Sequence, residues 1–168
     1  DQLVIVSALA DPGPSYGLID RCLIAALTEN IEPLLCLTKS DLASADPVIE
    51  HYAALSVPAL VTHRGGSLTE LREHLRGHQS VFVGHSGVGK STLLLQALAS
   101  VEGRLSTLYV TGEESLQQVS LRARRLGLPR LDLPVLAETA LESVLDALAQ
   151  ARPGLIVLDS IQTLYTES

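Results

Sequence analysis

The stretch Gly84-His85-Ser86-Gly87-Val88-Gly89-Lys90-Ser91 decides the fold, because it matches the phosphate-binding pattern GxxxxGK(S/T). It follows the apolar run 80–83 and precedes a helical segment at 92–98, which is the strand–loop–helix context that the pattern requires. Glycines here let successive backbone N–H groups turn toward an anion, and the dipole of the following helix favours negative charge. We therefore predict a P-loop in which Lys90 reaches the β- and γ-phosphates of a nucleotide and Ser91 places its hydroxyl on Mg²⁺.

The expected nucleotide contacts extend over the whole loop. We expect the phosphates of GTP or ATP to be bound by Gly84, Ser86, Gly87, Val88, Gly89, Lys90, Ser91 and Thr92. The alternative is a glycine-rich turn without a ligand, but a random chain of this length would match the pattern on the order of once in 200.

A second element of the predicted magnesium site is Asp159, which ends the apolar run 155–158. An acidic residue at the carboxyl end of a buried strand is where a P-loop enzyme holds Mg²⁺. Strands that end in Asp are also common without a metal. Together with the upstream P-loop, the pattern predicts Ser91 and Asp159 as the magnesium-side residues.

A candidate base-reading motif follows the apolar run 34–37. Thr38-Lys39-Ser40-Asp41 matches (N/T)KxD, in which the carboxylate accepts two hydrogen bonds from guanine and the lysine stem lies along the base. Because adenine lacks that pair of donors, an unpaired carboxylate at Asp41 would reject ATP. Thr62 and His63 are expected to form a second base-contacting loop. Exposed turns without a ligand are the alternative for both segments, so GTP and ATP both remain open.

The rest of the chain alternates short apolar runs with amphipathic helical segments. We expect strands at Leu3–Val6, Leu34–Leu37, Ala59–Val61, Val81–Val83, Leu108–Val110, Val135–Leu136 and Leu155–Leu158. Apolar stripes predict helices over 19–26, 68–75, 116–126 and 141–148, with stop signals at Gly77 and Gly127. This alternation predicts a three-layer α/β/α fold with a mostly parallel sheet of about seven strands, as one domain over 1–168.

Composition excludes several other classes of protein. The 168 residues carry a net charge of −7, which argues against a surface that wraps nucleic acid by neutralising phosphates. Aromatic residues make up only 3%, too few for a platform that stacks single-stranded bases. No apolar run approaches the roughly 20 residues of a membrane span. Cys22 and Cys36 are expected to be free thiols of a reducing, cytoplasmic compartment if the chain is natural.

The order of the motifs is reversed relative to ordinary GTPases, because the base-reading element precedes the P-loop. On this order, residues 1–98 resemble the circularly permuted RsgA family of ribosome-assembly GTPases. The resemblance rests on 1–6, on Leu18-Ile19-Asp20-Arg21, on the motif at 38–41 and on the loop at 84–91. It implies a GTPase and covers the middle of that family's GTPase domain.

Residues 90–168 are similar to the RadA (Sms) branch of RecA-like ATPases instead. The similarity is carried by Leu108 to Val119, by 136–139 and by 155–163. It implies that Glu113 activates the attacking water. The alternative for Glu113 is an acidic residue at a helix N-terminus, stabilised there by the helix dipole.

The two resemblances meet at the P-loop, so we expect a hybrid of two P-loop families, engineered from a permuted-GTPase half (1–98) and a RecA-like half (99–168). We expect one sheet centred on strand 80–83, with the strands of one half on each side. The strand that ends at Asp159 then lies either directly beside the P-loop strand or in a repacked position.

Neither half is complete in its catalytic parts. The GTPase half lacks a switch threonine segment and DxxG, where 159–162 stands instead, and the RecA-like half stops just after its metal-binding residue. We therefore expect Mg-nucleotide binding with weak or no hydrolysis, and an active GTPase or ATPase is the alternative. A further alternative is a DNA- or ribosome-associated module, based on Arg122, Arg124, Arg125 and Arg130, although a solvated helix face explains these arginines as well.

Overall fold

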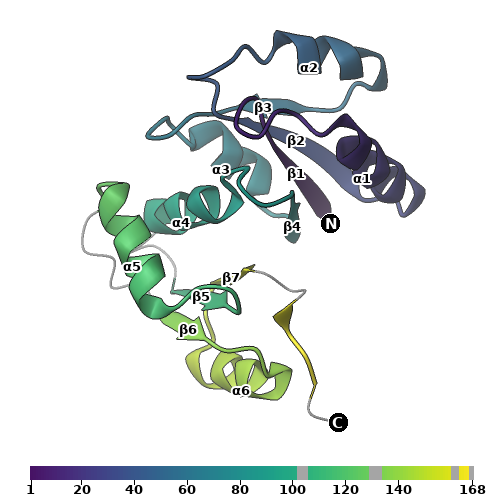
Figure 1. The fold of residues 1–168 in the computed structure, drawn as a ribbon. Coiled ribbons are helices and arrows are strands. Elements are labelled where there is room, and N and C mark those ends of the chain that lie inside the picture. The colour runs from purple at the N-terminus through teal and green to yellow at the C-terminus, as the bar shows by residue number, and fades with distance from the viewer. Residues whose placement is uncertain (102–105, 129–133, 160–162, 167–168) are drawn as a thin grey trace. The chain divides into compact units, whose positions relative to one another are not determined.

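The computed structural model describes residues 1–101, 106–128, 134–159 and 163–166. The chain divides into two compact units, residues 1–90 and 91–168. Strands and helices alternate along both units (Figure 1). None of the described helices has the length and hydropathy of a membrane span.

The first unit is a parallel sheet of four strands with helices between them. Its strands are β1 (Gln2–Ala8), β2 (Glu32–Thr38), β3 (Ala59–Val61) and β4 (Ser80–Val83), in the order β3-β2-β1-β4. The connections hold α1 (Tyr16–Thr28), α2 (Asp46–Tyr52), the short 3-10 helix η1 (Ala53–Leu55) and α3 (Thr69–Leu75). Residues on both faces of β1 and β2 are buried, as their continuous apolar sequence predicts.

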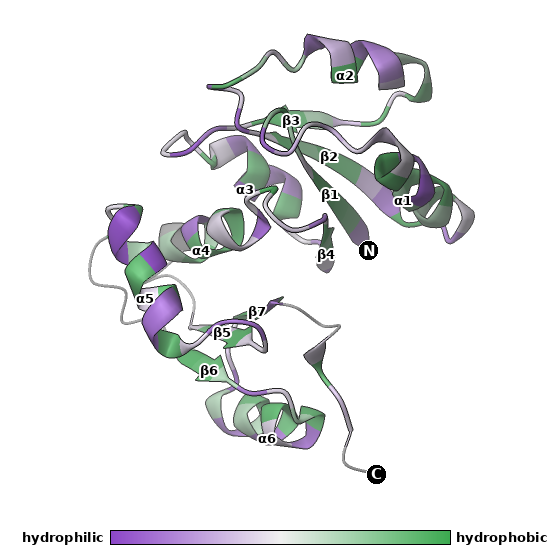
Figure 2. Cartoon of the chain, in the orientation of Figure 1, coloured by the Kyte–Doolittle hydropathy of each residue, from purple (hydrophilic) through white to green (hydrophobic). Residues whose placement is uncertain are grey.

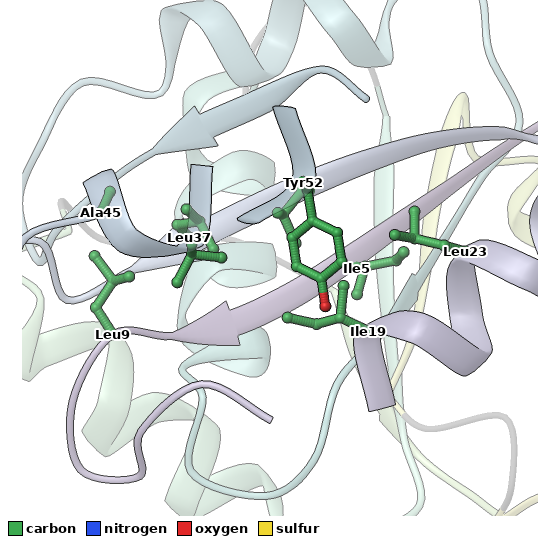
Figure 3. Close-up of a cluster of buried hydrophobic side chains, with 9 residues drawn as sticks. Ile5, Leu9, Ile19, Leu23, Leu37, Ala45 and Tyr52 are labelled. Atoms are coloured by element: carbon green, nitrogen blue, oxygen red, sulfur yellow. The ribbon is translucent and has the colours of Figure 1, made fainter. Parts of the chain in front are cut away.

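The core of the first unit fills one face of this sheet. Nine buried residues form it, and Figure 3 shows how they converge: Ile5, Leu9, Ile19, Leu23, Leu35, Leu37, Ala45, Val48 and Tyr52. They come from β1, β2, α1, α2 and the loops that follow β1 and precede α2. The other face is also covered, since Val4, Val6, Leu34 and Cys36 are each at most 1% exposed. The strands are thus held firmly enough to position the loops at their ends.

The second unit has a smaller parallel sheet. Its elements are α4 (Lys90–Val101), β5 (Thr107–Thr111), α5 (Leu116–Arg125), β6 (Val135–Ala137), α6 (Leu141–Ala151) and β7 (Leu155–Asp159), with the strand order β6-β5-β7. Leu108, Val110 and Val144 form the buried core between the sheet and α6. In Figure 2 the strands of both sheets are largely green, and α5 and α6 carry purple as well as green faces.

The helix ends follow the local sequence. Gly77 and Gly127, the predicted stop signals, adopt left-handed φ angles of 82° and 63° just after α3 and α5. Asn30 does the same after α1, with a φ of 54°. Helix α2 was not expected from the sequence, although Asp46 and Pro47 open it in the way that acidic residues and proline open many helices.

The seven strands and their parallel pairing are confirmed, but the strands form two sheets instead of one sheet centred on β4. β4 pairs with β1 over four residues and lies at one end of the first sheet. β7 pairs with β5 over five residues, from Thr107↔Leu155 to Thr111↔Asp159. Each sheet is built from the strands of one unit of the chain.

Candidate nucleotide-binding site

The carboxyl ends of the parallel strands of the first unit meet at one edge, where the P-loop begins. β1 and β2 run in register from Gln2↔Glu32 to Ala8↔Thr38, and β4 enters the loop after Val83. Ligand-binding loops of open α/β sheets lie at this edge. The sheet therefore brings the loop 84–91 and the motif 38–41 to the same edge.

Gly84 opens the P-loop in a position that only glycine fits. A Cβ atom on Gly84 would lie 2.5 Å from the carbonyl oxygen of Val6 and 3.0 Å from Cγ2 of Val88. The loop thus passes directly over the β1 backbone. A side chain here would push the loop off the sheet.

The turn of the P-loop has alternating backbone conformations. Gly87 and Gly89 have φ angles of 84° and 88°, while Val88 between them is outside the left-handed region and fully buried. Such alternation turns successive N–H groups to one side and forms an anion-binding concavity. The glycine cradle therefore fits a phosphate group.

Lys90, Ser91 and Thr92 form the first turn of α4, directly after this cradle. All three are half-buried, whereas Ser86 and Gly87 are exposed. Lys90 thus stands at the N-terminus of α4, where the helix dipole favours an anion.

Thr38, the first residue of the candidate base-reading motif, contacts the phosphate loop. Its hydroxyl donates a 2.6 Å hydrogen bond to the carbonyl oxygen of Val88, and both residues are buried. The Cβ position of Gly89 is 3.9 Å from the same hydroxyl oxygen. This contact ties the end of β2 to the turn of the P-loop.

Lys39 connects the same motif to the loop that follows β1. The residue has a left-handed φ of 62°, and its ammonium group donates a hydrogen bond to the carbonyl oxygen of Asp11. The neighbouring Pro12 places Cδ 3.4 Å from the Cβ position of Gly87. The loop after β1 is thus in contact with both the base-reading motif and the P-loop. Asp41 is exposed.

The second candidate base loop lies beside the first. The Ser40 amide donates to the carbonyl oxygen of Thr62 at 3.2 Å, and the Thr62 amide donates to Leu37 at 2.8 Å. Thr62 is buried, and within the described residues its hydroxyl has no hydrogen-bond partner. His63 is exposed. The structure thus brings the end of β3 next to the motif at 38–41.

Asp159 ends β7 in the second unit and is only 4% exposed. Its carboxylate accepts a 2.5 Å hydrogen bond from the hydroxyl of Tyr109, which is itself 1% exposed. Burial, and then the hydrogen bond to Asp159, raise the pKa of Tyr109 far above its usual range. The phenol therefore keeps its proton and acts as the donor. Sequence reasoning did not assign Tyr109 to the site.

Glu113 and Glu114 follow β5 and have different surroundings. Glu114 forms an ion pair with Arg122, and its amide donates to the Thr111 hydroxyl at 3.0 Å. Glu113 is exposed. Glu114 therefore joins the end of β5 to α5.

Glu138 is a further carboxylate at this edge of the second sheet, and the sequence did not single it out. It follows β6, and its Oε1 accepts hydrogen bonds from the amides of Thr139 at 2.8 Å and Ala140 at 3.0 Å. Both hydrogen bonds lower the pKa of Glu138, and the bond from the Ala140 amide has the larger effect. Its surroundings favour a loop-ordering role ahead of α6.

The donor atoms present suit a magnesium ion. Mg²⁺ prefers hard oxygen ligands and usually keeps waters and substrate phosphates as its other ligands. The Ser91 hydroxyl and the Asp159 carboxylate are ligands of that kind. Within the described residues there is no group of three or more His, Cys, Asp or Glu side chains that could hold a metal. The other sequence candidates, 160–162 and Arg130, lie outside the described residues.

Two family models match the chain, and both matches include the loop 84–91. The model described as RsgA GTPase matches residues 1–118, and the model described as AAA domain matches residues 71–168. The chain belongs to both families. The predicted hybrid of a permuted GTPase and a RadA-like protein is therefore confirmed, and the P-loop lies in the region that the two matches share.

Curated relatives divide in the same way. The DNA repair protein RadA of Pseudomonas aeruginosa is 52% identical over 84 residues, which are 50% of this chain and 18% of that protein. The small ribosomal subunit biogenesis GTPase RsgA of Alkaliphilus metalliredigens is 38% identical over 129 residues, 72% of this chain and 44% of that protein. The RsgA–RadA hybrid thus spans less than half of either relative.

A solved structure supports the fold. The crystal structure of YjeQ from Thermotoga maritima matches with a TM-score of 0.50 and 33% identity, over 58% of this chain and 37% of that one. The P-loop, the parallel strands and the two family matches together identify the chain as a P-loop nucleotide-binding protein.

Proposed function

We propose that the chain binds a magnesium–nucleoside triphosphate, with weak or no hydrolysis. The observation that carries the proposal is the cradle at Gly87–Gly89, whose alternating conformations suit a phosphate. Lys90 would contact the β- and γ-phosphates, and Ser91 and Asp159 would hold Mg²⁺, which screens the phosphate charge when bound.

Guanine is the base that we propose. The motif 38–41 lies beside the P-loop within the first unit, through the bond from Thr38 to Val88. Asp41 would accept two hydrogen bonds from guanine, and Lys39, Thr62 and His63 would border the base. ATP, the ligand implied by the second half, is the competing candidate.

Weak turnover is proposed because residues 159–162 stand where a GTPase has DxxG. Glu113, which directly follows Gly112 at the end of β5, is the candidate for orienting water. An active GTPase or ATPase is the alternative, and phosphate release measured with GTP and with ATP separates the two. Because Arg122 is paired with Glu114, we do not propose the arginines of α5 as a nucleic-acid surface.

Calorimetric titration with GTP and ATP, with and without Mg²⁺, tests the proposal. Lys90→Ala should weaken binding of both nucleotides at least tenfold, since a charge-assisted hydrogen bond contributes about 1.5–3 kcal/mol. Arg76→Ala removes one positive charge from an exposed position after α3 and is the matched control. Equal affinities for Lys90→Ala and Arg76→Ala would refute the P-loop assignment.

The guanine assignment has its own variant. Asp41→Asn should weaken the binding of GTP and leave the binding of ATP unchanged, because the side-chain amide of asparagine would place a hydrogen-bond donor opposite a guanine donor. Asp46→Asn, a nearby exposed residue at the start of α2, is the control. A loss of the same size for both nucleotides would exclude base reading by Asp41.

A further inference from the structure

We propose that Tyr109 is a positioning residue for the magnesium-side carboxylate of Asp159. This inference rests on the proposed binding of Mg-nucleotide and goes beyond it, because it assigns to a buried phenol the placement of the metal ligand. The bond between the Tyr109 hydroxyl and Oδ2 of Asp159, at 2.5 Å, is the observation on which it stands.

The sheet register explains how the two side chains meet. Tyr109 pairs with Val157 and Thr111 pairs with Asp159 across the parallel strands β5 and β7. Residues two apart on a strand share a face, so Tyr109 and Asp159 lie on the same face of the sheet. The long phenol then spans the two-residue offset along the strands and reaches the carboxylate.

β5 holds Asp159 by its backbone as well. The Gly112 amide donates to the carbonyl oxygen of Asp159 at 3.1 Å, while Tyr109 donates to its side chain. One contact from β5 and one from the residue that follows it thus fix both the main chain and one carboxylate oxygen.

The burial of Asp159 indicates a cation ligand. A carboxylate that is 4% exposed has lost most of its hydration, and such a group is costly to bury without a compensating charge. The phenol supplies one hydrogen bond but no charge, so a bound cation would complete the compensation.

A second tyrosine–aspartate pair provides the matched control. In the first unit, buried Tyr52 donates to Oδ1 of Asp20 at 2.8 Å, and Asp20 is exposed. Tyr52→Phe therefore removes a hydrogen bond of the same type from a carboxylate that water can reach. Any effect confined to Tyr109→Phe comes from the surroundings of Asp159.

The test measures Mn²⁺ binding to the nucleotide-loaded chain by electron paramagnetic resonance. Tyr109→Phe should weaken Mn²⁺ about tenfold or more, the usual loss when a partner of a metal ligand is removed. Nucleotide affinity measured in EDTA should stay within about twofold of wild type. Damage to the P-loop would instead weaken nucleotide binding as well. Tyr52→Phe should match wild type in both measurements.

Asp159→Asn separates this inference from the proposed function. Asp159→Asn should lose Mn²⁺ affinity, and adding Tyr109→Phe to it should cause no further loss, because the two residues act as one unit. Wild-type Mn²⁺ affinity in Tyr109→Phe, or in Asp159→Asn, overturns the inference even if nucleotide still binds. Failure of the wild-type chain to bind any nucleotide overturns the proposed function, and the inference with it.

A measurement on the wild-type chain covers the case in which Tyr109→Phe does not fold. The chain has four tyrosines, so ¹³Cζ-tyrosine labelling gives four resonances. The Tyr109 resonance is the one that remains in each of the variants Tyr16→Phe, Tyr52→Phe and Tyr165→Phe. Addition of Mg²⁺ to the nucleotide-bound chain should shift this resonance. An unshifted Tyr109 resonance overturns the inference.

Discussion

The hydroxyl of Thr38 donates a 2.6 Å hydrogen bond to the carbonyl oxygen of Val88, fifty residues further along the chain. Both residues are buried, so the bond is shielded from water. It fixes one carbonyl of the P-loop turn to the end of β2, and thereby orients the peptide units on either side. The order of the loop thus depends on the strand that carries the base-reading motif.

Thr38→Val should destabilise the chain and weaken nucleotide binding. Valine keeps the shape but removes the donor, and leaving the Val88 carbonyl unsatisfied costs about 1–3 kcal/mol. Urea unfolding measures the stability, and calorimetry with GTP measures the affinity. Thr38→Ser retains the hydroxyl and should keep most of both. A loss in Thr38→Ser together with wild-type stability and affinity in Thr38→Val would show that the methyl group matters and the bond does not.

Gly84→Ala should abolish phosphate binding without unfolding the first unit. The added methyl would lie 2.5 Å from the Val6 carbonyl oxygen, so the loop has to leave the sheet. Gly13→Ala is the control, because nothing lies within 4 Å of its Cβ position. Calorimetry with GTP should find no binding in Gly84→Ala and unchanged binding in Gly13→Ala. Undiminished affinity in Gly84→Ala would mean that the loop does not bind through this conformation.

Much of the fold could be predicted from local patterns. The seven strands are apolar runs that end in turn residues, and the P-loop is specified within eight residues. Helix α2 was missed because its buried residues, Val48 and Tyr52, are too few to form a clear stripe. The order of the strands in each sheet could not be predicted either, because the hydrophobic period of a strand indicates which face is buried but not which strand lies beside it.

The contacts of the site were harder to predict than its residues. Thr38 was recognised through its motif, but its bond to Val88 depends on β1 and β2 ending in register. Tyr109 was part of an ordinary apolar strand in the sequence. Its hydroxyl reaches the Asp159 carboxylate only because Tyr109 lies two residues before Thr111, the residue that pairs with Asp159 across the sheet. Such information lies in the pairing of strands and not in any one segment.

The buried thiol of Cys36 should make stability depend on alkaline pH. Burial raises the pKa of Cys36 from 9.0 to about 12. Above pH 9 the unfolded chain loses this proton while the folded chain keeps it, so the unfolded state binds fewer protons. The free energy of unfolding should therefore fall between about pH 9 and 12, by up to about 1.4 kcal/mol per pH unit.

Cys36→Val isolates this contribution, since the buried tyrosines titrate alike in both proteins. Urea unfolding at pH 8, 9.5 and 10.5 should show wild type losing stability relative to Cys36→Val as the pH rises. A constant difference between the two proteins across that range would contradict the assignment.

Gly112→Ala should release the C-terminal segment 163–166 from the second unit. A Cβ on Gly112 would collide with Oγ1 of Thr163 and lie 2.7 Å from Cβ of the same residue, which is closer than a side chain can approach. That segment is held by the Tyr165 amide donating to Thr139 and by the Leu141 amide donating to Tyr165, each at 2.9 Å. Hydrogen exchange should therefore accelerate at both amides.

The amides of the first unit should exchange at unchanged rates in Gly112→Ala, because its sheet is formed entirely within residues 1–90. Gly17→Ala is the control for the substitution itself, since only the flexible end of Arg21 comes within 4 Å of that position. Gly17→Ala should leave the Tyr165 and Leu141 amides as protected as in wild type. If Gly112→Ala also leaves them protected, the segment 163–166 does not pack on Gly112 in solution.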